Sequence, residues 1–163
     1  MPARVSIRPA LAADVPSLLA LVREYWAFEG IDGFDETRAE HAPRRLFDNP
    51  ALGCAWIARD ASTPVGYLLA CYVFSLEQGG LTAEIDEFFV KPGHRGTGLG
   101  RRLLRTAEQA FAAAGCARVA LQLGRGNDAA RAFYGRCGYR ARDGYELMDK
   151  GLSPSAAPRL PRV

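Results

Sequence analysis

The chain has 163 residues, a length typical of one domain with a substantial core. Its formal net charge of +3 is mild, and its basic residues do not form a long stripe, which argues against a nucleic-acid-binding protein. No apolar segment approaches the length of a membrane span, and no apolar run follows the first basic residue. These features predict a soluble cytoplasmic protein without a membrane partner.

The four cysteines, Cys54, Cys71, Cys116 and Cys137, lie far apart and form no CxxC pair. Three of them stand in apolar or tightly packed contexts, where a free thiol behaves as a small apolar side chain. We therefore expect reduced core thiols, with neither a metal site nor a cysteine nucleophile.

The first third of the chain predicts a strand followed by two helices. Residues 5–8 alternate as a short strand does. Asp14 can cap a helix that has Pro16 in its first turn. The apolar stripe of this helix comprises Val15, Leu18, Leu19, Val22 and Trp26. After the glycine-rich acidic segment 30–36, "GIDGFDE", a second helix is predicted over residues 37–47.

The middle of the chain predicts three strands, a helix and a further strand. Residues 54–59 and 65–74 form an antiparallel hairpin, because the turn between them is short and polar. Residues 83–90, "AEIDEFFV", end in aromatic and β-branched residues that favour a strand. The apolar face of the next helix comprises Gly100, Leu103, Leu104, Ala107 and Phe111, and Gly115 caps it. With a buried strand at 118–123, this succession predicts a parallel crossover in a mixed α/β sheet flanked by helices.

A glycine-rich loop joins the strand 83–90 to the helix that follows it. It opens on the first turn of the helix, where backbone N–H groups lack intrahelical partners and the positive end of the dipole is exposed. Its glycines, Gly96, Gly98 and Gly100, would let a phosphate approach these groups. Nearby positive charge comes from Arg95, Arg101 and Arg102. An anion site is therefore predicted, and the alternative is a turn whose glycines serve only chain geometry.

Two common phosphate loops do not fit this segment. A nucleoside-triphosphate loop needs GxxxxGK[ST], and no Lys-Ser or Lys-Thr follows the glycines. The dinucleotide fingerprint GxGxxG fails because the spacing is Gly96-x-Gly98-x-Gly100. What fits is RxxGxG, beginning at Arg95 and ending at Gly100.

With this loop the chain resembles the GNAT superfamily of acyl-CoA-dependent N-acetyltransferases, whose pyrophosphate loop has the pattern [RQ]xxGx[GA]. Four other segments are similar in the same order. They are "VSIRPALAADVPSLLALV" for the first strand and helix, "GYLLACYVF" for the third strand, "NDAARAFYGRCGYRA" for the cofactor-side helix and turn, and "YELMDKGL" for the final strand. Together they cover residues 5–152.

The resemblance implies a central mixed, mostly antiparallel sheet with a splayed parallel strand pair, flanked by helices. It implies a single N-acetyltransferase domain over residues 1–152, followed by a proline-rich tail at 153–163, and it makes a homodimer plausible. The co-substrate would be acetyl-CoA, without a metal. Its pyrophosphate would bind the loop and its pantetheine amides would follow the strand edge. The implied coenzyme contacts are Phe88, Phe89, Val90, Arg95, Gly96, Thr97, Gly98, Leu99, Gly100, Arg101, Asn127 and Arg131.

Tyr134 is the implied proton donor to the coenzyme thiolate. It lies two helical turns after Asn127, which can cap this helix, and so both lie on the same side of it. The family places a tyrosine in this setting near the coenzyme sulfur. The alternative is that Tyr134 and Phe133 are core aromatics.

Three carboxylates, Glu84, Asp86 and Glu87, are candidates for the general base. Strand alternation places Glu84 and Asp86 on one face and Glu87 on the other, unless a bulge intervenes. Glu84 lies eleven residues before Arg95, the spacing of the glutamate base in some histone-acetylating members. The alternative is that these acids bind a cationic substrate or face solvent. Other members place a glutamate on the next strand, where this chain has Gln122, which cannot act as a base.

The expected function is acetyl transfer from acetyl-CoA to a primary amine by direct attack in a ternary complex. Segment 30–36 and the three strand carboxylates favour a cationic small molecule as the acceptor. His94 could contact a phosphate or be solvated, and His41 is a minor candidate for the acceptor site. The alternatives are a non-catalytic acyl-CoA-sensing module and an acetyltransferase for protein N-termini or lysines.

Overall fold

The structure is a computed structural model that describes residues 5–152. The expected proline-rich tail, residues 153–163, lies outside this range. The chain forms two compact units, one ending at Gly126 and one beginning at Asn127. The first unit holds the sheet and the loop before the third helix.

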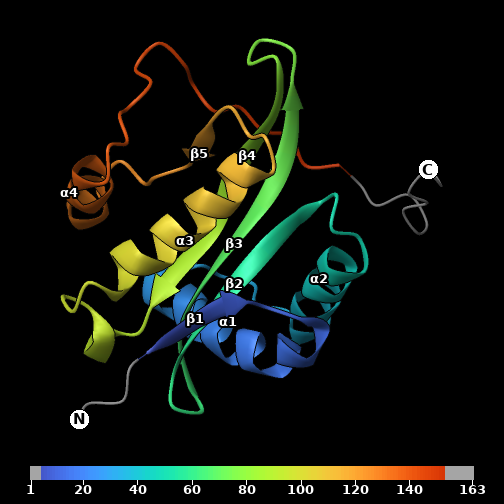
Figure 1. Cartoon of the computed structure of the whole chain (residues 1–163), viewed down its shortest axis with the longest axis vertical. Coiled ribbons are helices and arrows are strands. Elements are labelled where there is room, and N and C mark those ends of the chain that lie inside the picture. The colour runs from blue at the N-terminus through green and yellow to red at the C-terminus, as the bar shows by residue number, and fades with distance from the viewer. Residues whose placement is uncertain (1–4, 153–163) are drawn as a thin grey trace. The chain divides into compact units, whose positions relative to one another are not determined.

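The first unit is built on a five-stranded sheet in which strand order follows the chain (Figure 1). The strands are β1 (Ser6–Pro9), β2 (Gly53–Asp60), β3 (Thr63–Ser75), β4 (Gly80–Val90) and β5 (Val119–Leu121). Neighbours from β1 to β4 pair antiparallel, whereas β4 and β5 pair parallel. The expected mixed, mostly antiparallel sheet is therefore confirmed.

Three helices of the first unit cover the two faces of this sheet (Figure 1). They are α1 (Val15–Glu29), α2 (Glu36–Asp48) and α3 (Leu99–Ala113), with short 3-10 turns η1 (Ala12–Asp14) and η2 (Pro92–His94). Helices α1 and α2 pack on one face, and α3 packs on the other. The second unit contains α4 (Asp128–Arg136).

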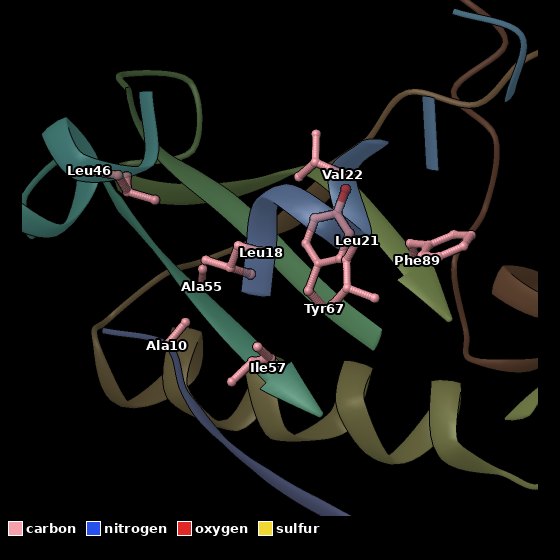
Figure 2. Packing of buried hydrophobic residues seen from close by; sticks show 9 residues of the cluster. All are labelled: Ala10, Leu18, Leu21, Val22, Leu46, Ala55, Ile57, Tyr67 and Phe89. Atoms are coloured by element: carbon pink, nitrogen blue, oxygen red, sulfur yellow. The ribbon is translucent and has the colours of Figure 1, made fainter. Parts of the chain in front are cut away.

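Every second residue of the central strands points toward α1 and α2 and contributes to the core between them. Figure 2 shows Leu18, Leu21 and Val22 of α1 beside Tyr67 of β3, whose side chain is fully buried. The apolar pattern predicts Leu19 in this stripe, but Leu21 is the buried residue and Leu19 is only partly covered. The 3.6-residue period identified the helix, and its exact rotation on the sheet was set by packing.

The opposite face is closed by the apolar stripe of α3. Its buried residues are Leu99, Leu103, Leu104, Ala107 and Phe111. The ring of Phe111 meets Trp56 of β2 edge to face, with 5.4 Å between centroids. Leu99, the first residue of the helix, packs against Ala58 and Val65. This contact fixes the point at which the preceding loop must end.

Two expectations for late strands need correction. β5 covers only Val119–Leu121 instead of 118–123, and it is partly exposed because β4 is its only strand neighbour in the described sheet. Residues 145–152, which resemble a final strand, form no regular element. A strand exists through its ladder of hydrogen bonds, and no strand pairing in the described part of the chain includes this segment.

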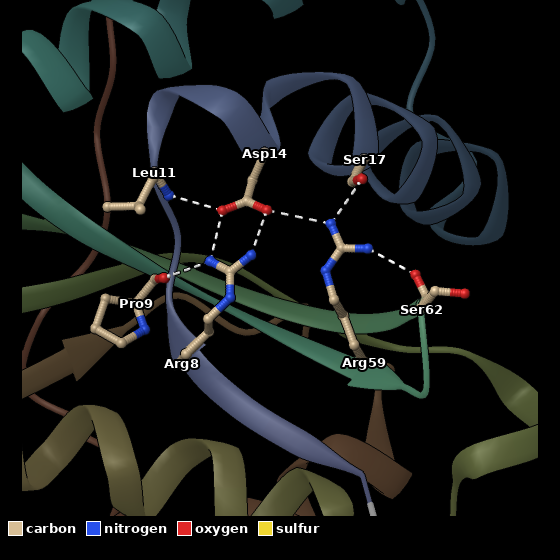
Figure 3. Close-up of polar contacts among 7 residues, drawn as sticks. All are labelled: Arg8, Pro9, Leu11, Asp14, Ser17, Arg59 and Ser62. Carbon is tan, nitrogen blue, oxygen red and sulfur yellow. Dashed lines mark hydrogen bonds and ion pairs between the residues drawn. The ribbon is translucent and has the colours of Figure 1, made fainter.

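A buried carboxylate connects β1, β2 and the start of α1 (Figure 3). Asp14 is 4% exposed and accepts hydrogen bonds from both terminal nitrogens of Arg8 at 2.7 Å. It also accepts from Arg59 Nη2 at 3.1 Å and from the Leu11 backbone N–H at 2.9 Å. Asp14 does occupy the N-cap position of α1, as expected, but its side chain makes no cap hydrogen bond. The Arg8 hydrogen bonds, supported by Leu11 and Arg59, hold the pKa of Asp14 well below its usual range.

Replacing Asp14 with asparagine should destabilise the protein. Asp14→Asn removes the charge that both guanidinium groups face, and we expect a loss of about 2 kcal/mol in the free energy of unfolding at pH 7. Because the pKa of Asp14 is depressed in the folded state, its contribution is complete above the ordinary aspartate pKa and is lost as the pH falls below about 4.

Urea unfolding of both proteins between pH 7 and pH 2.5 measures this effect. The difference between them should shrink below about pH 4. Asp32→Asn, at an exposed acid, is the matched control and should leave stability unchanged. A constant difference across this pH range would show that the Asp14 charge does not stabilise the fold.

Candidate functional site

The parallel pairing of β4 with β5 ends partway along β4. It joins Ala83 to Val119, Glu84 to Ala120 and Ile85 to Leu121. β4 continues to Val90 in pairing with β3 alone, and then enters the loop that precedes α3. The edge of β4 that faces β5 is thus paired at its beginning and not along the part that leads to the loop.

A bulge in β4 changes the direction of the three candidate carboxylates. In the pairing with β3, Glu87 lies opposite Leu69 and Ile85 lies opposite Ala70, so Asp86 is an extra residue. Glu84 lies opposite Cys71, which shares a face with Leu69 because the two are two residues apart on β3. Glu84 and Glu87 therefore share the face that α1 covers. The simple alternation that separated them is wrong at this position.

Glu87 is held by two hydrogen bonds from the core. Trp26 Nε1 of α1 donates to its Oε1 at 2.8 Å, and the Tyr67 hydroxyl donates to its Oε2 at 2.7 Å. Burial raises the pKa of Glu87, although both hydrogen bonds oppose this effect. Since each oxygen already accepts from a buried or half-buried donor, Glu87 links α1 to the sheet.

Asp86 lies near Glu84 and Glu87, and the three carboxylates make this part of β4 negative. Desolvation by the surrounding protein, increased by the charge of Glu84, raises the pKa of Asp86 even though the residue remains exposed. Burial, together with Glu29, Glu87 and Asp86, raises the pKa of Tyr25 to about 12, so this phenol stays neutral. A cation near these groups would be attracted by the carboxylates.

Glu84 contacts a residue of the neighbouring parallel strand. Gln122 Nε2, just after β5, donates to Glu84 Oε1 at 3.0 Å. Gln122 cannot act as a base, and the sequence pattern did not predict this contact. The register explains it, because Gln122 lies two residues beyond Ala120, the partner of Glu84, and so projects on the same face.

Two glycines give the loop before α3 its backbone shape. Gly96 and Gly98 have φ values of 75° and 83°, in the left-handed region, and Gly98 is the N-cap of α3. A Cβ added at either glycine would meet no heavy atom within 4 Å. The space beside the loop is therefore open, and an added side chain would project into it. Thr97 closes the turn by donating from Oγ1 to the His94 carbonyl at 2.8 Å.

The arginines around the loop do more than supply charge. Arg95 Nε donates to the Val90 carbonyl at 2.8 Å, and its guanidinium lies 4.3 Å from the centroid of Phe28 of α1. Arg95 thus fastens the end of β4 to α1. Arg102 turns toward β1 and donates to the Val5 carbonyl, while Arg101 is exposed in the first turn of α3. Arg95 and Arg102 thus donate to backbone carbonyls of two different strands or segments, Val90 and Val5.

The two histidines occupy different places. His94 Nε2 lies 3.3 Å from Asp60 Oδ2, which joins the loop to the β2–β3 turn. His41 Nδ1 contacts the carbonyl of Thr37 one turn earlier in α2. His94 therefore connects the start of the glycine loop to the end of β2, whereas the contact of His41 is within its own helix.

In the second unit, the predicted cap of α4 is confirmed. Asn127 Oδ1 accepts from the Ala130 backbone N–H at 3.1 Å. The half-buried ring of Tyr134 contacts Phe133 and Tyr139, with centroids 5.2 and 5.4 Å away. Arg131 is exposed on the same helix. An aromatic cluster therefore holds the Tyr134 ring within this unit.

All four cysteines are unpaired and partly buried, and burial raises the pKa of Cys54, Cys71 and Cys116. Within residues 5–152, no three His, Cys, Asp or Glu side chains are grouped as metal ligands would be. None of the helices in this range is long and apolar enough to cross a bilayer.

Comparison with known proteins finds relatives that are similar in sequence and in structure. A human spermidine/spermine N(1)-acetyltransferase-like protein 1 is 30% identical over 109 residues, which are 63% of this chain and 16% of that relative. The crystal structure of an integron cassette protein from the Cole Harbour Salt Marsh metagenome is 31% identical, with a TM-score of 0.80 over 91% of both chains.

An aminoglycoside acetyltransferase from an uncultured soil metagenomic sample is 20% identical, with a TM-score of 0.76 over 91% of this chain and 97% of its own. At this identity the similarity concerns the fold. The model of the acetyltransferase (GNAT) family matches residues 17–139, which include strands β2 to β5, the glycine loop and α4. The chain belongs to the acetyltransferase (GNAT) family.

Proposed function

We propose that this protein transfers the acetyl group of acetyl-CoA to a primary amine, with a cationic small molecule as the acceptor. The observation that carries the proposal is the end of the β4–β5 ladder at Ile85 and Leu121, after which β4 continues to Val90 and leads into a loop with left-handed glycines. This arrangement supplies a partly unpaired strand edge, which can pair with the amides of an extended ligand, followed by a helix N-terminus, which can bind its phosphates.

The residues present fit a coenzyme A molecule. The pantetheine amides would pair with the β4 edge beyond Ile85, and the pyrophosphate would lie at Gly96, Gly98 and the first turn of α3. Open space where a Cβ would project from these glycines supports this placement. Asn127 and Arg131 of the second unit are proposed coenzyme contacts by resemblance to the family.

The chemistry needs one proton acceptor and one proton donor. Bound acetyl-CoA would supply a thioester whose C–S bond breaks as the amine nitrogen forms its new bond to the acetyl carbon. A strand carboxylate takes the proton that the amine loses, and the Tyr134 hydroxyl donates a proton to the departing sulfur. Glu87 is the least suited of the three acids for this step, because both its oxygens already accept hydrogen bonds.

Preference for a cationic acceptor rests on Glu84 and Asp86 more than on the acidic segment 30–36. In that segment Asp35 caps α2 through the Arg38 N–H, and Glu36 forms an ion pair with Arg23. The charges of Asp35 and Glu36 are thus partly compensated within the chain and are less able to attract a cationic acceptor. The names of two relatives, a spermidine/spermine N(1)-acetyltransferase-like protein and an aminoglycoside acetyltransferase, are compatible with an acceptor that has several amino groups.

Activity on a panel of amines tests the function directly. We expect acetyl-CoA to bind with a micromolar dissociation constant in calorimetry, and thiol release to be stimulated most by di- and polyamines and aminoglycosides. Equal or better rates with neutral or anionic amines would contradict the proposed acceptor class. Binding with release from none of the small amines, protein N-termini or lysine peptides would favour a sensing module.

The glycine loop is tested by a pair of nearly isosteric substitutions at Gly98. Both Gly98→Asp and Gly98→Asn must adopt the same left-handed backbone, which asparagine and aspartate tolerate, but only aspartate adds negative charge beside the expected pyrophosphate. Calorimetry should show affinity for coenzyme A at least about tenfold weaker for Gly98→Asp than for Gly98→Asn. Equal affinities would indicate that no phosphate approaches this loop.

The role of Tyr134 is tested by removing its hydroxyl alone. Tyr134→Phe should keep the aromatic contacts and coenzyme affinity while lowering kcat by about 10²-fold. Tyr139→Phe, at a ring that packs against Tyr134, is the control and should retain the wild-type kcat. An unchanged kcat for Tyr134→Phe would mean that another group protonates the thiolate.

A further inference from the structure

A cavity lies between α3 and the beginning of the edge strand β1. Its volume is about 490 Å³, which is within the usual range of small-molecule sites. Val5 and Ile7 line it from the sheet, and Arg102 and Arg105 line it from the helix. In the order of strands, β2 and β3 separate β1 from β4. The cavity therefore lies at the opposite edge of the described sheet from the β4–β5 pair that would hold coenzyme A.

The backbone groups of β1 alternate between facing β2 and facing away from it, as in any antiparallel pair. The Ala10 N–H, one residue after the strand, donates to the carbonyl of Ala55 in β2 at 2.8 Å. Ala10 therefore faces β2. Counting back along the strand, the N–H and C=O groups of the odd-numbered residues from Val5 to Pro9 face the open edge, where the cavity lies.

Most of these outward groups are not free to pair with another strand. The Val5 carbonyl accepts from Arg102 Nη2 at 2.8 Å. The Pro9 carbonyl accepts from Arg8 Nη1 at 2.9 Å, and proline has no N–H to donate. Within residues 5–9, Ile7 alone keeps both of its outward groups, and it lines the cavity. Because the edge is blunted in this way, the cavity suits a small molecule better than an extended peptide.

The wall that α3 contributes to the cavity is positively charged. Arg102 and Arg105 are one helical turn apart, and neither forms an ion pair with an acid in the range 5–152. Arg102 uses one of its five N–H donors on Val5, and the Arg105 guanidinium has no hydrogen bond to another residue of this range. Two like charges on one helix face repel each other. A bound anion would offset this repulsion and accept from several donors at once.

The next turn of α3 adds neutral polar groups to the same wall. Thr106 Oγ1 donates to the Arg102 carbonyl at 2.9 Å, so its hydroxyl is left as an acceptor for a ligand. Gln109 is exposed at the cavity, and its amide can both donate and accept. The wall thus offers donors for an anion in one turn and partners for hydroxyl groups in the next.

We propose that this cavity is a second ligand site, which binds a small phosphate monoester with a hydroxylated body, as in a sugar phosphate. The phosphate accepts hydrogen bonds from the guanidinium groups of Arg102 and Arg105 and from the Ile7 N–H. The hydroxyls of the body donate to Thr106 and exchange hydrogen bonds with Gln109. Inorganic phosphate would fill only part of the volume, which favours a ligand with a body. The site does not depend on the acetyl transfer proposed above.

Backbone amide chemical shifts of the isotopically labelled protein test this site, because they separate the cavity from the glycine loop. We expect at least one of glucose 6-phosphate, ribose 5-phosphate and glycerol 3-phosphate to shift the Ile7 and Thr106 amides with a dissociation constant below about 1 mM. Inorganic phosphate should bind more weakly, and glucose, which has no charge, should cause no shift. Shifts confined to the Gly96 and Gly98 amides would place the phosphate at the loop and overturn the inference.

Three variants identify the contacts. Arg105→Gln removes one of the two cations and should weaken binding of the sugar phosphate by about tenfold. Arg45→Gln, at an exposed position of α2, removes the same charge from another helix and should leave the affinity unchanged. Thr106→Val keeps the shape of the side chain but not its hydroxyl, and should bring the affinity for the sugar phosphate down to that for inorganic phosphate. The affinity for inorganic phosphate itself should not change in Thr106→Val.

Coenzyme A itself carries a phosphate monoester on its ribose, so the titration is repeated with coenzyme A at saturation. An unchanged affinity for the sugar phosphate supports a separate site, whereas competition would mean that the coenzyme reaches the cavity and would overturn the inference. Equal losses in Arg105→Gln and Arg45→Gln would reduce the binding to general charge attraction and overturn it as well. So would tighter binding of polyaspartate than of any sugar phosphate, or an Ile7 amide that none of the phosphates shifts.

Discussion

The parallel pairing of β4 with β5 extends over three residue pairs, and the candidate site depends on where it stops. Up to Ile85 both edges of β4 are paired in the sheet, so its backbone groups are satisfied by neighbouring strands. Beyond Ile85 only the β3 side is held by a strand. A longer ladder would close the edge on which the proposed coenzyme arm lies, and a shorter one would remove the contact between Glu84 and Gln122.

The rest of the first unit keeps this edge and the following loop in place. Helix α1 is joined to β4 through the hydrogen bond from Trp26 to Glu87, and to the loop through the stacking of Arg95 on Phe28. On the other face, Leu99 fixes the start of α3 in the core. The loop backbone is thus anchored at both ends, which preorganises its N–H groups for an anion without ordering a flexible segment on binding.

The bulge at Asp86 gives three carboxylates on one strand three environments. Glu87 is drawn into the core and stabilises the packing of α1, Asp86 remains exposed, and Glu84 is held from β5. Acids of similar intrinsic strength therefore differ in exposure and in hydrogen-bond partners within four residues of chain.

The sequence by itself determined the resemblance to the family, the order of the elements from β1 to α4 and the place of the glycine loop. These follow from local signals: the periods of apolar residues, the spacing of the glycines, and the cap at Asn127, none of which requires knowledge of distant contacts. The end of β5, the absence of a strand at 145–152, and the engagement of Asp14 with Arg8 and Arg59 were decided by tertiary structure.

The same holds for the faces of the carboxylates and the partner of Gln122. A bulge reverses the alternation of a strand without leaving a mark in its own sequence, and a cross-strand hydrogen bond depends on the register between segments almost forty residues apart. Residue types thus indicated which groups could carry the chemistry. Strand register decided which of them meet.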